Sequence, residues 1–591
     1  MTPSNIPRRQ FVKNSMLSLA ALGTACHLKQ EKKPNIICIM TDDQGWGDLG
    51  IHGNPYVRTP TLDKLALSGA RLNRFYVSPV CAPTRASLLT GRYHPRTGTH
   101  GVTRREEMMR LDETTIAQTL QSHGYATGCF GKWHNGAHYP YHPNGKGFDE
   151  FFGFCAGHWN NYFNTSLEHN GQEVKTRGYI ADVITDEAIN FINTHRDRPF
   201  FCYIPYNTPH SPFQVPQSCF EKYKSMRLDD LTASVYAMCE NIDDNVSRIL
   251  DTLNSLQLEE DTIVVFLCDN GPNSDRYNGN MRGRKGSLHE GGVRVPFFIR
   301  WTGHIEPGLV LDELTAHIDL LPTILRLCKI PLPGKDIIDG KDLSPLLLQK
   351  SSTWPDRMIF HNWRQRGAVR TNRYRLVVDN EKTELYDMLT DPQEKQDIST
   401  LNPQKTASLK KAYDEWLAEV TKNGYDSLPI PIGYEERPFV ELPAHEAILL
   451  KTSEKTGISY NDRQGWANDW VTNWTDIRAY PWWPVDIMED GFYEISLKYT
   501  CPATDIGSRI RIEIGQSILE GRITRAYDPP VKPSPDRIPR KEVYEKSWAH
   551  LNLGALFLKK GQKHLIVRAL SRPGNQVMEL KSVIVQRREK I

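Results

Sequence analysis

One cysteine of this chain differs from the others in its surroundings. Cys81 opens the stretch "CAPTRASLLTG", in which Pro83 and Arg85 follow closely and a helix-like run comes next. Cys38 and Cys268, in contrast, lie within apolar runs, where a thiol behaves as a small buried hydrophobe. The polar, proline-marked turn makes Cys81 a candidate for chemistry instead of packing.

Oxygen ligands follow two of the apolar runs. "NIICIMTDDQGWGD" places Asp42 and Asp43 directly after one run, and "TIVVFLCDNG" places Asp269 and Asn270 at the end of another. Three carboxylates and one amide suit a hard cation such as Ca²⁺ or Mg²⁺, whereas zinc would recruit His or Cys. An acidic pair after a strand is more often a turn or a helix cap, so a metal site depends on further partners.

Basic and imidazole side chains end other runs of the same kind. Lys132 and His134 lie in "FGKWH", His210 in "PYNTPHSP" and Lys285 in "MRGRKGSLHEGGVRVP". Taken singly, each is more often a surface charge or a hydrogen-bonded structural histidine. Ligands of open α/β sheets gather at the carboxyl ends of the strands, where these residues would meet the acidic set. A metal ringed by Lys, Arg and His predicts a site for a tetrahedral oxyanion ester.

The elements that would position these residues are short apolar strands alternating with amphipathic helices. The strand candidates cover 35–41, 125–131, 199–206, 262–270 and 295–301, and the helical patterns cover 114–124, 182–195 and 232–256. Continuous apolar strands in this alternation predict an α/β domain, with a mainly parallel sheet between two layers of helices. We place this domain at residues 34–357.

The pattern changes twice in the last part of the chain. Residues 358–427 contain a hairpin-like alternation and a closing helix, which predict a small α+β subdomain. A proline-rich linker is expected at 428–445. Residues 446–591 alternate at period two between turns, which predicts an appended all-β sandwich of the jelly-roll type.

Tryptophans are frequent at the start of the predicted sandwich. They are candidates for stacking on sugars, but filling a core or an interdomain face is the favoured interpretation. The residues concerned are Trp466, Trp470, Trp474, Trp482 and Trp483.

The first 25 residues have the form of an export signal. Arg8 and Arg9 in "RRQFVK" resemble a twin-arginine signal, and the apolar run that follows is shorter than the roughly 20 residues of a membrane span. "LGTAC" resembles a bacterial lipobox, so Cys26 is either a lipidated membrane attachment or an incidental cysteine after a cleaved signal. We expect export across the inner membrane, to the periplasm or as a cell-surface lipoprotein.

Composition excludes several other classes of protein. Because Lys and Arg number 73 and Asp and Glu number 70, the net charge is only +3, and no nucleic-acid partner is expected. The 11 cysteines show no regular spacing, so a disulfide framework is not indicated. A chain of 591 residues exceeds one ordinary core, which agrees with several domains.

At Cys81 these observations converge on a known family. "CAPTRASLLTG" resembles the signature of the type I sulfatases, members of the alkaline phosphatase superfamily. The resemblance runs from about Asn35 to Asn423 and includes "GKWH", "TPHSP", "CDNG" and "GGVRVP". It implies an alkaline-phosphatase-like fold and a sulfuric ester hydrolase. In that family the motif cysteine is oxidised after translation to formylglycine, which implies a formylglycine-generating enzyme as a partner.

The resemblance also implies a role for each polar residue. Hydrated formylglycine at position 81 is a geminal diol: one hydroxyl attacks sulfur and expels the alcohol, and the other collapses the sulfated hemiacetal to release sulfate. The implied ligands of one Ca²⁺ are Asp42, Asp43, residue 81, Asp269 and Asn270. Arg85 and His134 would orient and activate the diol. Lys132, His210 and Lys285 would grip the sulfate, with His210 or Lys285 protonating the leaving oxygen.

One segment departs from the family pattern. Some members place a serine shortly after "GFD", whereas this chain has Gly157 and His158 near that place. His158 and Asn160 are candidate substrate contacts, and a purely structural loop is an equally good interpretation.

The predicted function is therefore a calcium-dependent formylglycine sulfatase acting on a sulfated oligo- or polysaccharide. An algal polysaccharide such as ulvan and a glycosaminoglycan are both candidate substrates, with specificity expected from loops 102–110, 157–164 and 361–370. Phosphonate monoester and phosphodiester hydrolases of the same superfamily are the alternative, although they carry Asp-His in place of Asp269-Asn270. A non-catalytic sugar-binding lipoprotein is disfavoured, because binding alone needs no oxidisable cysteine.

Overall fold

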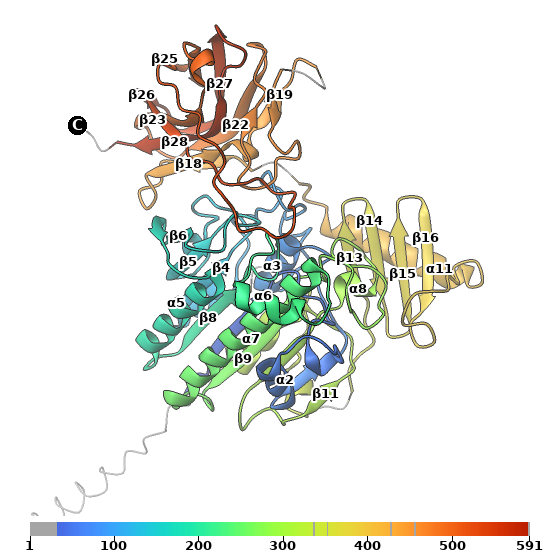
Figure 1. The fold of residues 1–591 in the computed structure, drawn as a ribbon. Helices are drawn as coiled ribbons and strands as arrows, with labels where there is room; N and C mark the ends of the chain where they lie inside the picture. Colours follow the sequence, from blue (N-terminus) through green and yellow to red (C-terminus); the bar gives the residue numbers. More distant parts are fainter. Residues whose placement is uncertain (1–31, 335–336, 351–352, 426–427, 454–456, 589–591) are drawn as a thin grey trace, which may run out of the picture.

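A computed structural model describes residues 32–588, except 335–336, 351–352, 426–427 and 454–456. The export signal and Cys26 lie outside the described residues. Figure 1 shows a large α/β body, a small sheet with one helix at its side, and an all-β unit on top. Among the described residues, no helix is both long and apolar enough to cross a membrane.

The body is organised around one ten-stranded sheet. Its centre is parallel, as the apolar runs predict: β1 pairs in parallel with both β8 and β9, and β4 pairs in parallel with β8. The edges are mixed, because β10 runs antiparallel to β9. In spatial order the strands are β11 (Leu309–Leu311), β2 (Ala70–Leu72), β10 (Phe297–Arg300), β9 (Thr262–Cys268), β1 (Asn35–Thr41), β8 (Phe200–Pro205), β4 (Ala126–Lys132), β5 (Glu150–Phe154), β6 (Ser166–His169) and β7 (Gln172–Lys175).

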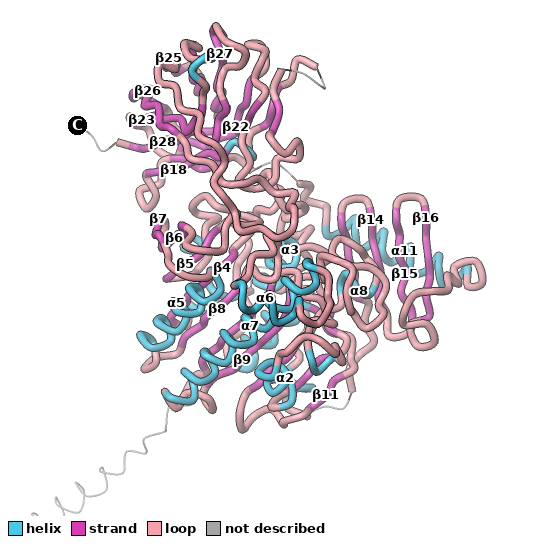
Figure 2. The backbone as a smooth tube through the Cα atoms, viewed as in Figure 1, coloured by secondary structure: helices cyan, strands magenta, loops and turns pink. Residues whose placement is uncertain are grey.

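Helices cover both faces of this sheet (Figure 2). Because successive strand residues point to opposite faces, Ile37 and Ile39 of β1 pack with one helix layer, and Ile36 and Met40 pack with the other. The first layer contains α2 (Pro60–Leu67), α5 (Ile180–His195) and α7 (Asp230–Ser255), and the second contains α3 (Cys81–Thr90), α4 (Ile116–Ser122) and α9 (Leu320–Leu327). Burial on both faces explains why these strands are continuous apolar runs.

The small sheet beside the body is a four-stranded antiparallel meander. Its strands are β13 (Ile359–Trp363), β14 (Arg366–Arg370), β15 (Tyr374–Asp379) and β16 (Lys382–Asp387), and α11 (Pro403–Val420) packs on it. A buried carboxylate joins this sheet to the body: Glu290 of α8 (Glu290–Val293) accepts from Arg375 Nη2 at 2.6 Å and from Tyr76 Oη at 2.7 Å.

We predict that Glu290→Gln destabilises the protein by roughly 3–5 kcal/mol, because the buried Arg370 and Arg375 lose the carboxylate that they share, and the buried Glu394 remains near Arg375, 3.5 Å from its Nε. Burial opposes ionisation, but Arg375 and its neighbours lower the pKa of Glu290 to about 2 from its usual 4.5. This carboxylate therefore stabilises the fold fully above about pH 4.5, and its contribution is lost as the pH falls towards 2. Urea midpoints at pH 7 and pH 3 measure both effects, with the exposed Glu306→Gln as the control. An unchanged midpoint at pH 7 would contradict this role.

The C-terminal unit consists of two packed sheets. One contains β17 (Ile430–Ile432), β19 (Ile448–Leu450), β22 (Tyr480–Ile487), β24 (Arg509–Ile514), β25 (Ser517–Arg522) and β27 (Gly561–Ser571). The other contains β18 (Phe439–Pro443), β20 (Ser459–Tyr460), β21 (Val471–Thr472), β23 (Gly491–Thr500), β26 (Ala549–Leu558) and β28 (Glu579–Arg587). The segment 428–445 is not a free linker, because β17 pairs with β22 and β18 pairs with β28.

Two of the tryptophans singled out in the sandwich are core residues: Trp474 and Trp483 are fully buried in its hydrophobic core. Trp470 is nearly buried against Trp548, and its indole N–H has no partner among the described residues. Trp466 and Trp482 are half-buried. Packing therefore accounts for Trp474 and Trp483.

Candidate active site

The strand register brings the acidic residues together. Thr41, the last residue of β1, lies opposite Cys268, the last residue of β9, so Asp42 and Asp269 leave the sheet side by side. Asp43 adopts a left-handed backbone with φ of 66°, and its N–H donates to Asp269 Oδ1 at 3.2 Å. A non-glycine residue in this region is uncommon, and such backbone strain concentrates at functional sites.

Cys81 lies at the first turn of α3, facing these carboxylates. The helix begins at Cys81 itself. Cys81 Sγ and carboxylate oxygens of Asp42 and Asp269 all lie within 4.8 Å of one another. Burial raises the pKa of the Cys81 thiol, which disfavours a thiolate nucleophile. The position therefore suits a cysteine that acts after modification better than one that acts as a thiol.

Arg85 ties three elements of the site together. Its Nε and Nη2 donate to Asp269 Oδ2 at 3.1 and 2.7 Å, and its Nη1 donates to the Lys132 carbonyl at 2.7 Å. The guanidinium is fully buried, one helical turn after Cys81. Arg85 thus fixes α3 against the ends of β9 and β4. This positioning role is separate from its predicted role in orienting the nucleophile.

Two lysines and one histidine complete the charged cluster. Lys132 Nζ lies 2.6 Å from Asp42 Oδ2, and Lys285 Nζ lies 2.6 Å from Asp43 Oδ1. His210 Nε2 lies 3.7 Å from Asp43 Oδ2. Burial opposes the charge of Asp42, but Lys132 and the other cations hold the pKa of Asp42 well below its usual range. The site is thus preorganised with cations at the positions where an anionic group would bind.

The oxygen donors fit a hard cation. Asp42 Oδ1 and Asn270 Oδ1 are buried and have no hydrogen-bond partner among the described residues. Asn270 Nδ2 donates to Asp43 Oδ1 at 2.8 Å, which leaves its carbonyl oxygen for a ligand. Unpartnered buried oxygens are costly unless a cation or water satisfies them. Asp42, Asp43, Asp269 and Asn270 thus supply the all-oxygen donor set that Ca²⁺ and Mg²⁺ prefer.

His134 is set up as a neutral base. Its Nε2 donates to the Val102 carbonyl at 2.9 Å, so the proton is on Nε2 and Nδ1 holds a free lone pair. Nδ1 is buried and without a partner in the described part of the chain. Burial, aided by Lys132, lowers the pKa of His134 well below 6.5. A neutral imidazole with an open acceptor can take a proton from a neighbouring hydroxyl.

The loop after "GFD" packs directly against His134. A Cβ on Gly157 would lie 2.6 Å from His134 Nε2, so a serine does not fit here without a shift of the ring. His158 Nε2 and Asn160 Oδ1 are buried and lack partners among the described residues. Both candidate substrate contacts are thus buried, and each has one polar side-chain atom without a partner among the described residues.

Sequence reasoning missed several residues of this site. Asn135 Nδ2 donates a hydrogen bond to the Ala82 carbonyl at 3.1 Å, and Arg276 Nη2 donates one to the Asp43 carbonyl at 2.9 Å. Asn207 and Thr208 follow β8, and their buried polar side-chain atoms have no partner within the described ranges. These two lie in "PYNTPHSP" beside His210, so the motif itself was a usable signal.

An α/β sheet whose strand ends carry carboxylates suited to a hard cation, with Arg, Lys and His around them, has the arrangement of a hydrolase of oxyanion esters. Comparison with known proteins makes this class specific. Residues 34–330 match the sulfatase family model, and residues 284–423 match the model of the N-sulphoglucosamine sulphohydrolase C-terminal region. The chain therefore belongs to the sulfatase family, within the alkaline phosphatase superfamily, and is a sulfuric ester hydrolase.

Individual relatives agree with this assignment. Human arylsulfatase A is 34% identical over 422 residues, which span 63% of this chain and 80% of the relative. Mouse N-acetylgalactosamine-6-sulfatase is 33% identical over 58% of this chain and 72% of its own length. The crystal structure of Ps i-CgsB is 31% identical, with a TM-score of 0.62 over 67% of this chain and 94% of that one.

Proposed function

We propose that this protein releases sulfate from a sulfated carbohydrate, using formylglycine formed from Cys81 and one Ca²⁺ held by Asp42, Asp43, Asp269 and Asn270. The observation that carries the proposal is the position of Cys81 Sγ, within 4.8 Å of the Asp42 and Asp269 carboxylates at the start of a buried helix. A formylglycine-generating enzyme is the partner that this modification requires.

Charge balance supports an anionic ester as the substrate. The three carboxylates of the site are matched by three cations: Asp42, Asp43 and Asp269 face Lys132, Lys285 and Arg85. A divalent cation added to this neutral set creates a positive site, which attracts a sulfate monoester. When bound, Ca²⁺ polarises oxygens and favours the ionised form of a nearby hydroxyl.

The chain's own residues then bind the substrate and transfer the protons. Lys132 and Lys285 bind the anionic oxygens, and His134 accepts a proton at Nδ1. His210 donates Nδ1–H to the Ser211 carbonyl at 2.7 Å, which points Nε2 toward Asp43 and the site. From that position a doubly protonated His210, which carries a second proton on Nε2, or the ammonium group of Lys285 beside it, can protonate the departing alcohol oxygen.

A carbohydrate substrate is supported by the relatives. Ps i-CgsB was crystallised with k-i-k-neocarrahexaose, at 30% identity to this chain, and N-acetylgalactosamine-6-sulfatase is among the curated relatives. Algal polysaccharides such as ulvan and glycosaminoglycans are both within this class. We place the enzyme in the bacterial periplasm or at the cell surface, on the strength of Arg8, Arg9 and the lipobox-like Cys26.

The test combines one mass measurement with one comparison of rates. We expect the tryptic peptide that contains residue 81 to carry formylglycine in the active protein. We also expect 4-nitrophenyl sulfate to be cleaved faster than a phosphate diester or a phosphonate ester. Unmodified Cys81 in active enzyme would refute the nucleophile, and faster cleavage of a phosphorus ester would refute the substrate class.

A further inference from the structure

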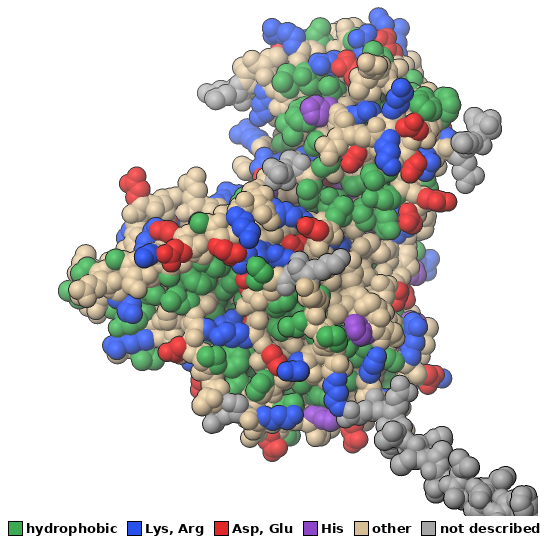
Figure 3. All heavy atoms as spheres, turned by 180° about the vertical axis from the view of Figure 1, so that it is seen from behind, with side chains coloured by type: hydrophobic (Ala, Val, Ile, Leu, Met, Phe, Trp, Pro, Cys, Tyr) green, Lys and Arg blue, Asp and Glu red, His purple; other side chains and the backbone are tan. Residues whose placement is uncertain are grey.

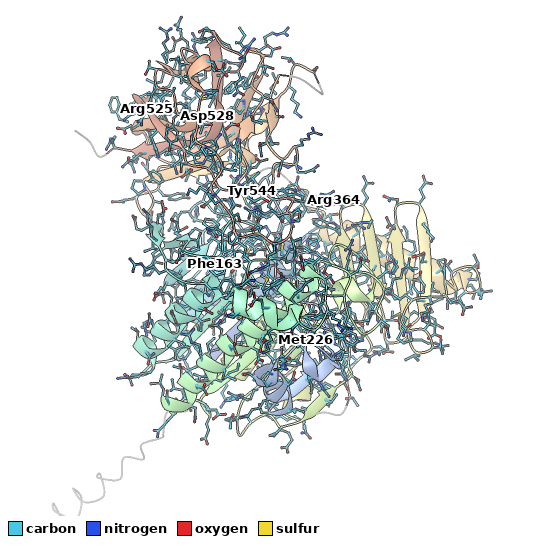
Figure 4. All side chains as sticks on the ribbon, in the orientation of Figure 1. Phe163, Met226, Arg364, Arg525, Asp528 and Tyr544 are labelled. Carbon is cyan, nitrogen blue, oxygen red and sulfur yellow. The ribbon has the colours of Figure 1, made fainter. Side chains whose placement is uncertain are left out.

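A long loop of the sandwich leaves its own domain and reaches the catalytic body. It covers residues 523–548, between β25 and β26, and we call it the β25–β26 loop. In Figure 4, Arg525 and Asp528 lie with the sandwich, whereas Tyr544 lies at the junction with the body. Connections of this length without helix or strand are uncommon in compact domains and are often functional.

Hydrogen bonds fasten this loop to the body, and an ion pair within the loop supports them. Gln214 Nε2 donates to Ser534 Oγ at 3.0 Å and to Asp536 Oδ1 at 2.6 Å. Arg537 Nη2 donates to Gln217 Oε1 at 2.7 Å, at the start of α6 (Gln217–Lys224). Arg540, whose side chain is 1% exposed, pairs with Asp536 at 3.2 Å. The loop is thus built into the catalytic body.

Other contacts also join the sandwich to the catalytic body. His138 Nε2 lies 2.9 Å from Glu446 Oε2, and both side chains are buried. Asn468 Nδ2 donates to the His158 carbonyl at 3.1 Å. Figure 3 shows, from behind, that the sandwich and the body form a continuous surface. The sandwich therefore holds the loop in a defined place against the body.

The loop brings a carboxylate to the rim of the sulfatase site. Glu542 Oε1 accepts from Ser211 Oγ at 2.5 Å, and Ser211 directly follows His210, whose Nε2 lies 3.7 Å from Asp43. Burial opposes the charge of Glu542, but His158, His210 and the hydrogen bond from Ser211 lower the pKa of Glu542 below its usual 4.5. Glu542 is thus a carboxylate next to a site for which we propose an anionic substrate. Because it would repel the sulfate group, it needs another role.

Two open polar atoms lie in the same region. His158 is 5% exposed and Asn160 is 8% exposed, yet His158 Nε2 and Asn160 Oδ1 have no partner in the described part of the chain. The loop also fixes their segment, because Arg540 donates to the Asn160 carbonyl. Buried polar atoms without partners are rare, and a bound hydroxyl group would satisfy them.

We propose that the β25–β26 loop forms the outer wall of the sulfate-ester site, and that Glu542, with His158 and Asn160, binds hydroxyl groups of the sugar that carries the sulfate. This inference rests on the proposed function. An ionised carboxylate accepts hydrogen bonds from sugar hydroxyls and repels a second sulfate or a carboxylate. The preferred substrates are therefore sulfated sugars with free hydroxyls on that side of the ring, and the sandwich is part of the active site.

Glu542→Gln tests this assignment because it removes the charge and keeps the shape. The matched control is Glu545→Gln in the same loop, whose side chain is 38% exposed and pairs with Lys532 at 3.5 Å. The probes are 4-nitrophenyl sulfate and whichever oligosaccharide from carrageenan, ulvan or chondroitin sulfate the wild-type enzyme desulfates fastest. Formylglycine content and thermal midpoint are measured for every variant.

We expect Glu542→Gln to lower kcat/KM for the oligosaccharide at least tenfold more than for the aryl sulfate, mainly through KM. Its preference for singly over doubly sulfated rings should fall at least fivefold. Equal losses on both probes, no change on either, or wild-type enzyme that cleaves the aryl sulfate but no oligosaccharide would overturn the inference. Formylglycine-bearing wild-type enzyme that cleaves neither probe would instead refute the proposed function.

Discussion

Cys81→Ala is expected to lower kcat for sulfate-ester hydrolysis by roughly 10⁴-fold or more, the usual scale for loss of a nucleophile. Cys81 is the residue placed at the start of α3 against Asp42 and Asp269, where we propose that its oxidised form is the nucleophile. The alanine is smaller than the cysteine and fits the buried position, so the fold should persist. Sulfate release from 4-nitrophenyl sulfate, together with the thermal midpoint, measures both expectations.

Cys81→Ser makes the same prediction more specific. A serine has one hydroxyl where the hydrated aldehyde has two, so it can take up sulfate and cannot expel it. We expect at most one sulfate per protein molecule, visible as added mass on the peptide that contains residue 81. Cys219→Ala, a half-buried cysteine on α6, is the control and should keep wild-type turnover. Multiple turnovers by the serine variant would rule out the two-hydroxyl chemistry.

Part of the charged cluster at the candidate site was predictable because four of its residues end or follow strands. Asp42, Lys132, His210 and Asp269 each follow an apolar run, and a parallel sheet brings all such ends to one edge. Periodicity alone therefore predicted their meeting, although they are far apart in the sequence. Their pairing was beyond prediction: Lys132 with Asp42, and Arg85 with Asp269, are decided by side-chain packing.

The contribution of the sandwich was not predictable from local pattern. Ser211 and Glu542 are separated by 331 positions, and nothing near Glu542 marks it as part of a catalytic site. The segment 428–445 has the prolines of a linker, yet β17 and β18 within it pair with strands much later in the chain. Local composition records turns and alternation, whereas docking of one domain on another depends on surfaces that form only after folding.

The tryptophans show that local sequence can also suggest a role that the fold does not support. Their density suggested sugar stacking as one possibility, but Trp474 and Trp483 donate their indole N–H to the Ala479 and Pro443 carbonyls inside the sandwich. A buried indole with a satisfied N–H is a packing residue. The favoured interpretation holds for these two, and the contact with substrate passes in our proposal to the β25–β26 loop.

Removal of the calcium ion that we propose is the second change for which we expect a large effect. Loss of the cation should cost several kcal/mol of transition-state stabilisation, or about 10³-fold in kcat, and added Ca²⁺ should restore activity. Zn²⁺ should restore it poorly, because Asp42, Asp43, Asp269 and Asn270 are all oxygen ligands. A direct readout independent of turnover is the thermal midpoint, which should rise with Ca²⁺ as a ligand that binds only the folded state.

Asp269→Asn tests whether the acidic cluster is the source of this dependence. The variant loses one ligand charge and leaves Arg85 without the carboxylate that lies 2.7 Å from its Nη2. We expect the Ca²⁺ concentration for half-maximal stabilisation to rise at least about tenfold, since ligand charge sets calcium affinity. Asp275→Asn, six residues on and with a 90% exposed side chain, removes the same charge outside the cluster and should leave this concentration unchanged. The proposed site lies at the ends of β1 and β9, where Asp42 Oδ1 and Asn270 Oδ1 are buried without a partner among the described residues. If both variants shift the calcium dependence, or if neither does, the cation is not held at this site.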